Sequence, residues 1–137
     1  MPTIDLLDRY LAAEKDKPFS WDSQGTGDCM TFVAGWGIAL NGIDFAADLR
    51  GRYCDEAGAR ALLEAEGGAV AFFNRVSGER RPEGQQQRGD IGLLAYKGWH
   101  LAMICTGSMW VLRSATTGLR YIRRPPEHIW APNPTRI

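Results

Sequence analysis

The spacing of apolar residues divides the chain into a helical N-terminal half and a C-terminal half of short strands. Apolar residues recur at helical intervals within residues 3–15 and again from Cys29 to Leu40. Thr3 precedes the first segment as a candidate N-cap, with Asp5 in the first turn, and Asp28 precedes the second. The pattern predicts that the second helix ends at Asn41–Gly42 and that further helical pieces lie at 44–50, 55–66 and 69–76.

The second half of the chain predicts a small sheet. Residues 77–88 are rich in Gly, Arg and Gln and predict an exposed loop. Apolar runs separated by glycine follow, and they predict four antiparallel strands at 90–96, 99–106, 109–115 and 119–123. Pro125 and Pro126 then close the predicted sheet, and Glu127–Trp130 predicts a last helical turn. Helices followed by a meandering sheet indicate the α+β class, and 137 residues predict one domain, 1–137.

Charge and composition exclude several classes of protein. Sixteen basic and sixteen acidic residues cancel to a net charge of zero, so we expect no nucleic-acid partner. The sequence contains no run of 18 apolar residues, so it predicts no membrane span. Acidic residues interrupt residues 1–17, which therefore lack the apolar core of a signal peptide. The three cysteines are widely spaced and form neither a zinc motif nor a disulfide scaffold. We therefore expect synthesis in the cytoplasm and no metal or organic cofactor.

Cys29 and His100 are the candidates for a nucleophile and its base. In the first turn of a helix, unpaired backbone N–H groups and the helix dipole stabilise a thiolate, and Cys29 occupies that position. His100 begins a strand that, packed on this helix, could present the ring to the thiol. A structural interpretation also stands, because cysteines are often buried and a histidine at a strand start is usually a structural or surface residue.

The residue that would orient the His100 ring depends on the register of the following hairpin. A three-residue loop at 106–108 places Ser114 opposite His100, whereas a two-residue loop places Arg113 or Ala115 there. Ser114 is our choice for the third site residue. It is equally well explained as an ordinary polar residue of a strand.

Other chemically capable residues have structural explanations. His128 follows the double proline and resembles part of a surface turn. Cys54 and Cys105 are expected in the core or an interface, with Cys105 facing away from His100 because side chains alternate along a strand. The remaining candidates are tryptophans expected in the core and arginines expected on a solvated face or a partner-binding edge: Trp36, Trp110, Trp130, Arg120, Arg123 and Arg124.

Several motifs follow one another in a recognisable order. Trp21 and a glycine-containing loop precede Asp28-Cys29, Gly89-Asp-Ile opens a strand, and His100-Leu-Ala-Met-Ile lies on the next one. This order resembles the NlpC-type cell-wall peptidases, which are papain-like enzymes. The segments GDCMTFVA, LRGRY, EGG and RGDI are similar to an uncharacterised phage and prophage branch of that group, found among tail genes. Phe19 stands where the family often has tyrosine, and Trp-Asp-Ser replaces Trp-Gly-Gly at 21–23.

The resemblance implies a papain-like, NlpC-type fold in which N-terminal helices pack on a small C-terminal antiparallel sheet. It implies that the Cys29 thiolate attacks an amide carbonyl while His100 accepts and returns the proton. The Cys29 N–H and a neighbouring donor would hold the oxyanion, and Asp28 and Trp21 would support the site.

The function that follows is a phage tail-associated cysteine hydrolase that cleaves amide bonds in peptidoglycan peptides. We expect the protein to be made in the bacterial cytoplasm and carried in the virion tail, with tail-tip or hub proteins as partners. One alternative is a structural tail-tip (baseplate) component with the same fold and little or no activity. The other is a free bacterial amidase or acyltransferase.

Overall fold

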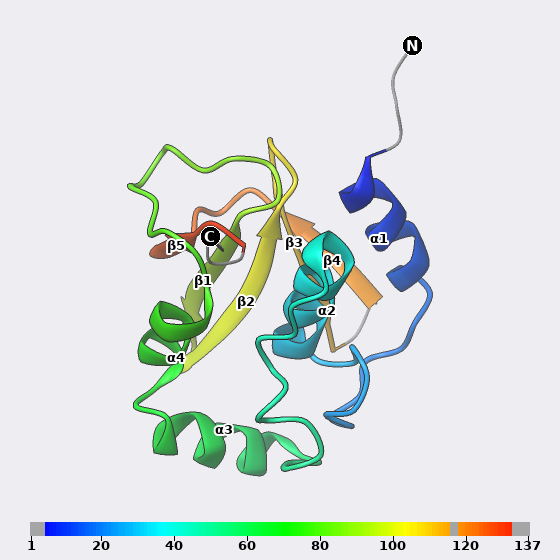
Figure 1. The fold of residues 1–137 in the computed structure, drawn as a ribbon, viewed down its shortest axis with the longest axis vertical. Helices are drawn as coiled ribbons and strands as arrows, with labels where there is room; N and C mark the ends of the chain where they lie inside the picture. Colours follow the sequence, from blue (N-terminus) through cyan, green and yellow to red (C-terminus); the bar gives the residue numbers. More distant parts are fainter. Residues whose placement is uncertain (1–4, 116–117, 133–137) are drawn as a thin grey trace.

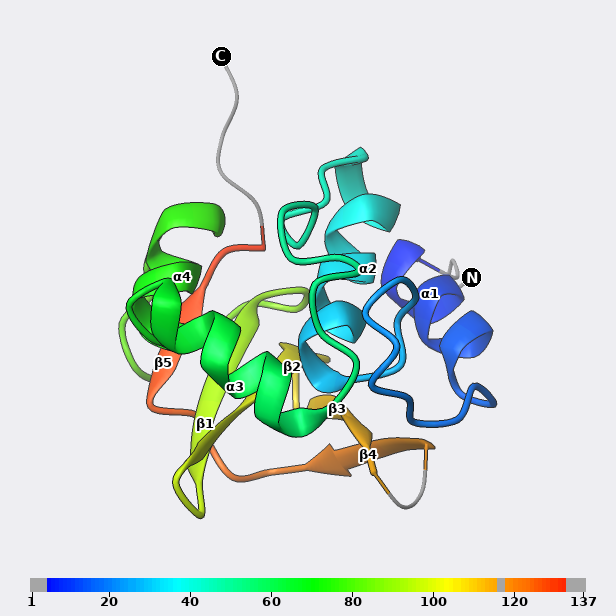
Figure 2. The same ribbon diagram turned by 90° about the horizontal axis from the view of Figure 1, so that it is seen from below.

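The computed structural model describes residues 5–115 and 118–132, which form an α+β structure with four helices and one five-stranded antiparallel sheet. The helices are α1 (Leu6–Glu14), α2 (Cys29–Asn41), α3 (Glu56–Ala65) and α4 (Ala69–Val76). The strands are β1 (Ile91–Tyr96), β2 (Trp99–Cys105), β3 (Trp110–Ser114), β4 (Gly118–Ile122) and β5 (His128–Trp130). The strand order is β4-β3-β2-β1-β5, and the helices gather on one face of the sheet (Figures 1 and 2).

Helix α2 lies at the centre of the fold, and its ends are where the sequence predicts them. The Thr31 N–H donates to the Asp28 carboxylate (2.9 Å) and the Asp28 N–H donates to the Thr31 hydroxyl (3.2 Å), which completes a capping box. Gly42 ends the helix in the left-handed conformation at φ 79°. α2 packs against α1 on one side and against β2 and β3 on the other. This position explains why residues 30–37 are all buried.

Two expectations about the helices need correction. Asp5, expected inside the first turn of α1, is its N-cap and accepts from the Asp8 N–H, whereas Thr3 lies outside the described residues. The helix expected at 44–50 is wrong, because that segment is a series of turns. There the Asp44 carboxylate accepts from the Ala46 N–H and from Arg50, so it satisfies a turn in place of a helix. None of the helices in the described part of the chain is long and apolar enough to cross a membrane.

The sheet has one strand more than expected. The four predicted strands are present as β1 to β4, but the helical turn expected at Glu127–Trp130 is wrong, because residues 128–130 pair with β1 as β5. Residues 78–81, at the start of the predicted loop, form backbone hydrogen bonds with residues 129–131, on the other side of β5 from β1. The double proline therefore does not close the sheet. Residues 123–127 carry the chain across the outer sheet face from β4, at one edge, to β5, at the other (Figure 2).

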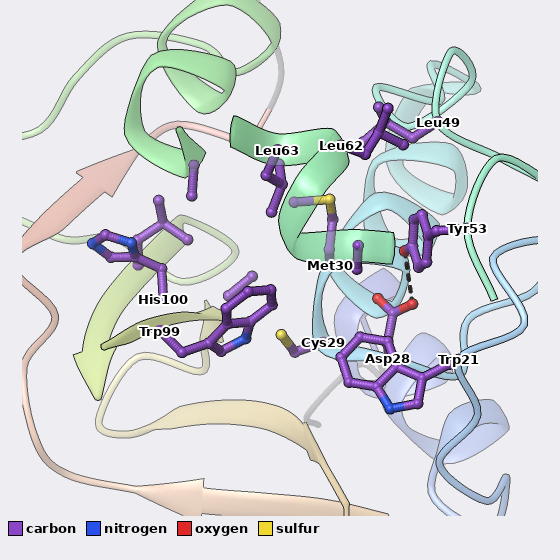
Figure 3. A pocket seen from close by; sticks show the side chains of 14 residues that line it. Trp21, Asp28, Cys29, Met30, Leu49, Tyr53, Leu62, Leu63, Trp99 and His100 are labelled. Carbon is purple, nitrogen blue, oxygen red and sulfur yellow. Dashed lines mark hydrogen bonds between the residues drawn. The ribbon is translucent and has the colours of Figure 1, made fainter. Parts of the chain in front are cut away.

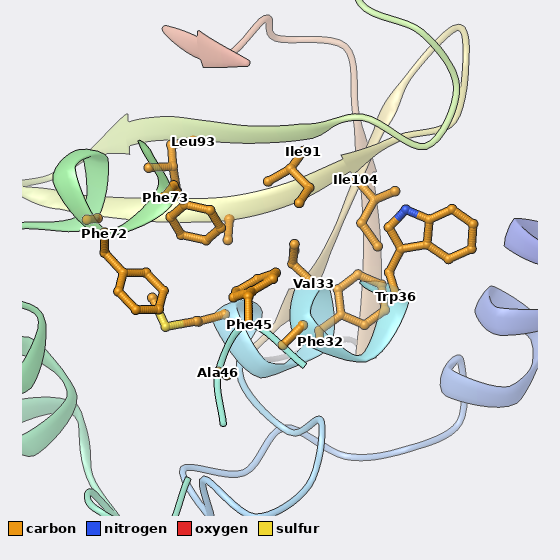
Figure 4. Packing of buried hydrophobic residues seen from close by; sticks show 14 of the residues in the cluster. Phe32, Val33, Trp36, Phe45, Ala46, Phe72, Phe73, Ile91, Leu93 and Ile104 are labelled. Carbon is orange, nitrogen blue, oxygen red and sulfur yellow. The ribbon is translucent and has the colours of Figure 1, made fainter. Parts of the chain in front are cut away.

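Two apolar clusters cover the two faces of the sheet. The larger lies between the helices and the inner face, where aromatic rings of α2, α4 and the turn at 45 meet aliphatic residues of β1 and β2 (Figure 4). The smaller lies on the outer face and includes Met103, Cys105 and Trp110. Pro126 from the crossing segment is buried there, in contact distance of Gly92 in β1. The predicted core positions of Trp36, Trp110 and Trp130 are confirmed, since all three are buried.

Strands β2 and β3 pair over only a short distance. Their ladder contains Ile104↔Val111 and Cys105↔Trp110, whereas β3 pairs with β4 at five positions. The connecting loop has four residues, 106–109, closed by the Thr106 N–H donating to the Met109 carbonyl (2.8 Å). This register is that of a two-residue turn at 107–108, the alternative that directs Ala115 toward the position opposite His100, and the three-residue hairpin is not correct. Beyond Ile104 the two strands separate, and this separation opens the sheet beside the start of α2.

Candidate active site

Cys29 lies where the sequence places it, at the first residue of α2, with its sulfur between the rings of Trp21 and Trp99 (Figure 3). It lines two hollows. One is a small internal cavity of about 20 Å³, bounded also by Asp28, Tyr53 and His100. The other is an open groove of about 430 Å³ that follows the separation of β2 and β3. Only the groove is large enough to admit part of a substrate.

The thiol of Cys29 is neutral in this environment. Burial and the neighbouring Asp28 carboxylate raise its pKa to about 12. Backbone N–H groups of Ala102, Cys29 and Met30 lower the pKa and offset part of this rise. The helix start therefore supplies the donors that the sequence predicts, but desolvation outweighs them in the resting structure.

The Ala102 N–H reaches the thiol because β2 has left β3 at this point. The Cys105 N–H donates to the Asp90 carbonyl and the Cys105 carbonyl accepts from Gly89, so the backbone of Cys105 faces β1. Backbone direction alternates along a strand, so that of Ala102 faces the opposite side, where the pairing with β3 has ended. Three N–H groups from two elements thus converge near one sulfur, and such donors could stabilise an oxyanion formed there.

Asp28 and Tyr53 fix the start of α2. The buried Asp28 carboxylate accepts from the Tyr53 hydroxyl (2.8 Å) as well as from Thr31. Burial and Asp28 together raise the pKa of the Tyr53 hydroxyl, so it acts as a hydrogen-bond donor. Asp28 therefore holds the start of α2 in place, and its charge is one reason why the Cys29 thiol keeps its proton.

His100 lines the same small cavity as Cys29, but its ring points elsewhere. The imidazole is directed away from the sulfur, toward β5 (Figure 3), and its centroid lies 6.2 Å from that of His128. No hydrogen bond joins His100 to Cys29 in the structure as described. The backbone thus brings the candidate base and the candidate nucleophile to one pocket, and a rotation of the His100 side chain is needed to bring the ring toward the thiol.

His128 belongs to β5, contrary to its expected place in a surface turn. Its ring stacks on Trp130 at 6.0 Å, and its Nδ1 contacts the Arg80 guanidinium. Burial, followed by the charges of Arg80 and His100, lowers its pKa. His128 therefore tends to stay neutral beside the ring that the proposed chemistry would protonate.

The structure does not bring Ser114 to His100. Ser114 pairs with Gly118 of β4 and shares the outer sheet face with Trp110 and Leu112, whereas His100 shares the inner face with Ala102. The register observed at Ile104↔Val111 would, if continued, place residue 115 opposite residue 100, but the strands have separated by then. The choice of Ser114 as the orienting residue is therefore wrong.

Arg113, considered above only as an occupant of that register position, has a different role. Its fully buried guanidinium pairs with the Glu14 carboxylate (2.5 Å) and donates to the carbonyls of Glu14, Lys17 and Thr26. One side chain thus ties β3 to the end of α1 and to the loop that leads to Cys29. The only signal in the sequence is an arginine inside an apolar strand, which does not reveal its partners.

The other cysteines lie away from this pocket. Cys105 is buried on the outer face, away from His100 as predicted, and Cys54 is exposed. All three cysteines are free thiols. Among the described residues, no group of three or more His, Cys, Asp or Glu side chains is placed to hold a metal ion.

Comparison with known proteins identifies a family to which the chain belongs. No curated protein matches the chain. Residues 4–131 match a protein family described as a domain of unknown function, DUF6950. This match spans α1 to β5, including the start of α2, β2 and the groove between β2 and β3. The chain therefore belongs to the DUF6950 family.

Proposed function

We propose that this protein is a cysteine hydrolase with a papain-like, NlpC-type fold, which cleaves amide bonds in peptidoglycan peptides as part of a phage tail. The observation that carries the chemistry is the placement of Cys29 at the start of α2, within a ring of backbone donors and on the same pocket as His100. The resemblance of the Asp-Cys, Gly-Asp and His-x-Ala-x-Ile motifs to NlpC-type peptidases supports the substrate class. The similarity of GDCMTFVA, LRGRY, EGG and RGDI to a phage and prophage branch found among tail genes supports the phage tail.

In the proposed reaction the neutral Cys29 thiol gives its proton to His100 as the sulfur attacks the amide carbon. The tetrahedral oxyanion accepts hydrogen bonds from backbone N–H groups of Cys29 and its neighbours. When this intermediate collapses, the C–N bond breaks and His100 returns the proton to the leaving amine. Water then hydrolyses the thioester and restores the thiol. His100 must turn toward the sulfur before the first step.

A structural tail-tip component is the second candidate, and two observations favour it. The thiol pKa of about 12 and the outward direction of the His100 ring describe a site that is not poised in its resting form. In that case the papain-like domain would serve tail assembly through its shape, and its cysteine would be idle.

Cleavage of purified cell-wall sacculi distinguishes the two candidates. Released peptides would be identified by mass spectrometry for the wild-type protein, for Cys29→Ala and for Cys54→Ser, with circular dichroism as the test of folding. Cys54 is the matched control because it is an exposed free thiol outside the pocket. The hydrolase proposal requires cleavage by the wild type and by Cys54→Ser but not by folded Cys29→Ala. Absence of cleavage by all three, or equal cleavage by all three, would refute it.

A further inference from the structure

The groove beside Cys29 has a charged wall that the proposed chemistry does not use. Its volume of about 430 Å³ follows the opening between β2 and β3, with apolar and aromatic walls that include Trp99, Leu101 and Leu112. Beyond them, the groove is lined by Arg120 of β4 and by Arg124 of the segment that follows β4. One continuous surface therefore joins the sulfur to two guanidinium groups.

Arg120 and Arg124 both reach the groove because side chains alternate between the two sides of an extended chain. Arg120, Ile122 and Arg124 line it, whereas Tyr121 and Arg123 do not. Side chains of an extended segment alternate between its two sides, so the residues at even positions share one side. Arg120 and Arg124 are four residues apart, about 13 Å along an extended chain, so they can serve two different anionic groups.

The other charged residues of the groove are already paired. Arg113 is bound to Glu14 (2.5 Å), and Glu56 is bound to Arg60 (3.1 Å). By contrast, no carboxylate within residues 5–115 and 118–132 lies within 4.0 Å of Arg120 or Arg124. The carboxylate of Glu127 accepts a hydrogen bond from the Ala95 N–H (2.8 Å), which lowers its pKa. The charge of Arg124 also lowers this pKa, but from a distance beyond that of an ion pair. The groove therefore carries two guanidinium groups without a carboxylate partner at close range.

We propose that Arg120 and Arg124 form a carboxylate-binding subsite for an acidic peptide, which lies in the groove with its scissile amide at Cys29. This inference rests on the proposed function and specifies the substrate that the site selects. The guanidinium fork matches a carboxylate in shape and charge. The apolar floor suits a peptide, and a chain of zero net charge offers no extended positive field for nucleic acid.

Binding to a protein without its nucleophile tests the subsite separately from catalysis. The Cys29→Ala protein would be titrated with a peptidoglycan stem peptide that carries an uncharged fluorescent dye and free carboxylates, and with the same peptide in which the carboxylates are amidated. Arg120→Gln and Arg124→Gln would be added to this background. Arg123→Gln is the matched control, because it removes the same charge from the same segment outside the groove.

We expect amidation of the peptide to weaken binding about tenfold, and each of Arg120→Gln and Arg124→Gln to weaken binding of the acidic peptide about fivefold, as for partly exposed charge-assisted hydrogen bonds. Arg123→Gln should leave it within twofold. Equal binding of the two peptides, no binding of either, or an equal loss in all three arginine variants would overturn the subsite.

The cleavage assay separates the two proposals. If the wild type cleaves free and amidated peptides at the same rate, the subsite fails and the hydrolase stands. If the wild type cleaves neither peptide while Cys29→Ala still binds the acidic peptide through Arg120 and Arg124, the hydrolase fails and the subsite stands.

Discussion

The alkylation rate of Cys29 is the most direct test of how the site is activated. With a pKa of about 12, roughly one molecule in ten thousand carries the thiolate at pH 8, against about a quarter for an ordinary cysteine of pKa about 8.5. A more basic thiolate is a better nucleophile, and its higher reactivity offsets the smaller thiolate fraction by about 40-fold. Cys29 in the folded protein should therefore react about 60-fold more slowly than Cys29 in the unfolded chain.

The assay is a time course with iodoacetamide at several pH values, with peptide mapping by mass spectrometry to separate the three cysteines. The same chain in urea supplies the unfolded reference. The rate at Cys29 should rise about tenfold per pH unit from pH 7 to pH 10 without a plateau, because only the thiolate reacts. A plateau below pH 9, or a rate within fivefold of the unfolded chain, would refute the reasoning. Either result would mean that the thiolate of Cys29 is far more populated in the resting site than this environment allows.

Three further predictions concern stability. Glu14→Gln leaves the buried Arg113 guanidinium without its carboxylate and should lower the free energy of unfolding in urea by about 3–5 kcal/mol; a loss below about 1 kcal/mol would contradict this. Gly92→Ala places a methyl group 2.6 Å from Pro126 and should cost about 1–3 kcal/mol in thermal unfolding, so an unchanged melting temperature would count against it. Because folding raises the Cys29 pKa to about 12, the folded thiol keeps a proton that the unfolded thiol, with a pKa of about 8.5, has lost by pH 9. Relative to Cys29→Ala, the wild type should lose about 1.4 kcal/mol per pH unit between pH 9 and pH 12, and parallel urea titrations of the two proteins would exclude this effect.

The parts of the fold that sequence predicts well are those specified by local chemistry. Asp28 and Gly42 fix both ends of α2 through their own side chain or backbone, so the position of Cys29 on the first turn followed directly. The positions of the first four strands followed from apolar runs between glycines. None of these features needs knowledge of distant residues.

Two of the failures involve partners elsewhere in the chain, and one involves a turn whose length the residues do not fix. Residues 44–50 have helical spacing, but Arg50 binds the Asp44 carboxylate and the carbonyls of residues 23–25, which holds the segment in turns. Residues 128–130 become a strand only because β1 offers them an edge. The β2–β3 register is that of a two-residue turn at 107–108, and the residue types there do not distinguish this turn from a three-residue loop.

The candidate site was predictable to the level of the backbone but not of the side chains. Cys29 and His100 reach one pocket as expected. The direction of the His100 ring depends on the space left beside His128, and the third donor near the sulfur is the Ala102 N–H, which no side-chain pattern can indicate.

The short ladder between β2 and β3 makes the sheet less stable but leaves Cys29 accessible from the groove. Each further rung would add backbone hydrogen bonds to the sheet, yet it would also take the Ala102 N–H from the thiol and narrow the only wide approach found to Cys29 within the described residues. Substitutions that extend the pairing of β2 with β3 should raise the melting temperature of the protein and close the groove to ligands. Selection for thermal tolerance alone would then be expected to close the groove, so its open state is a property that only function would preserve.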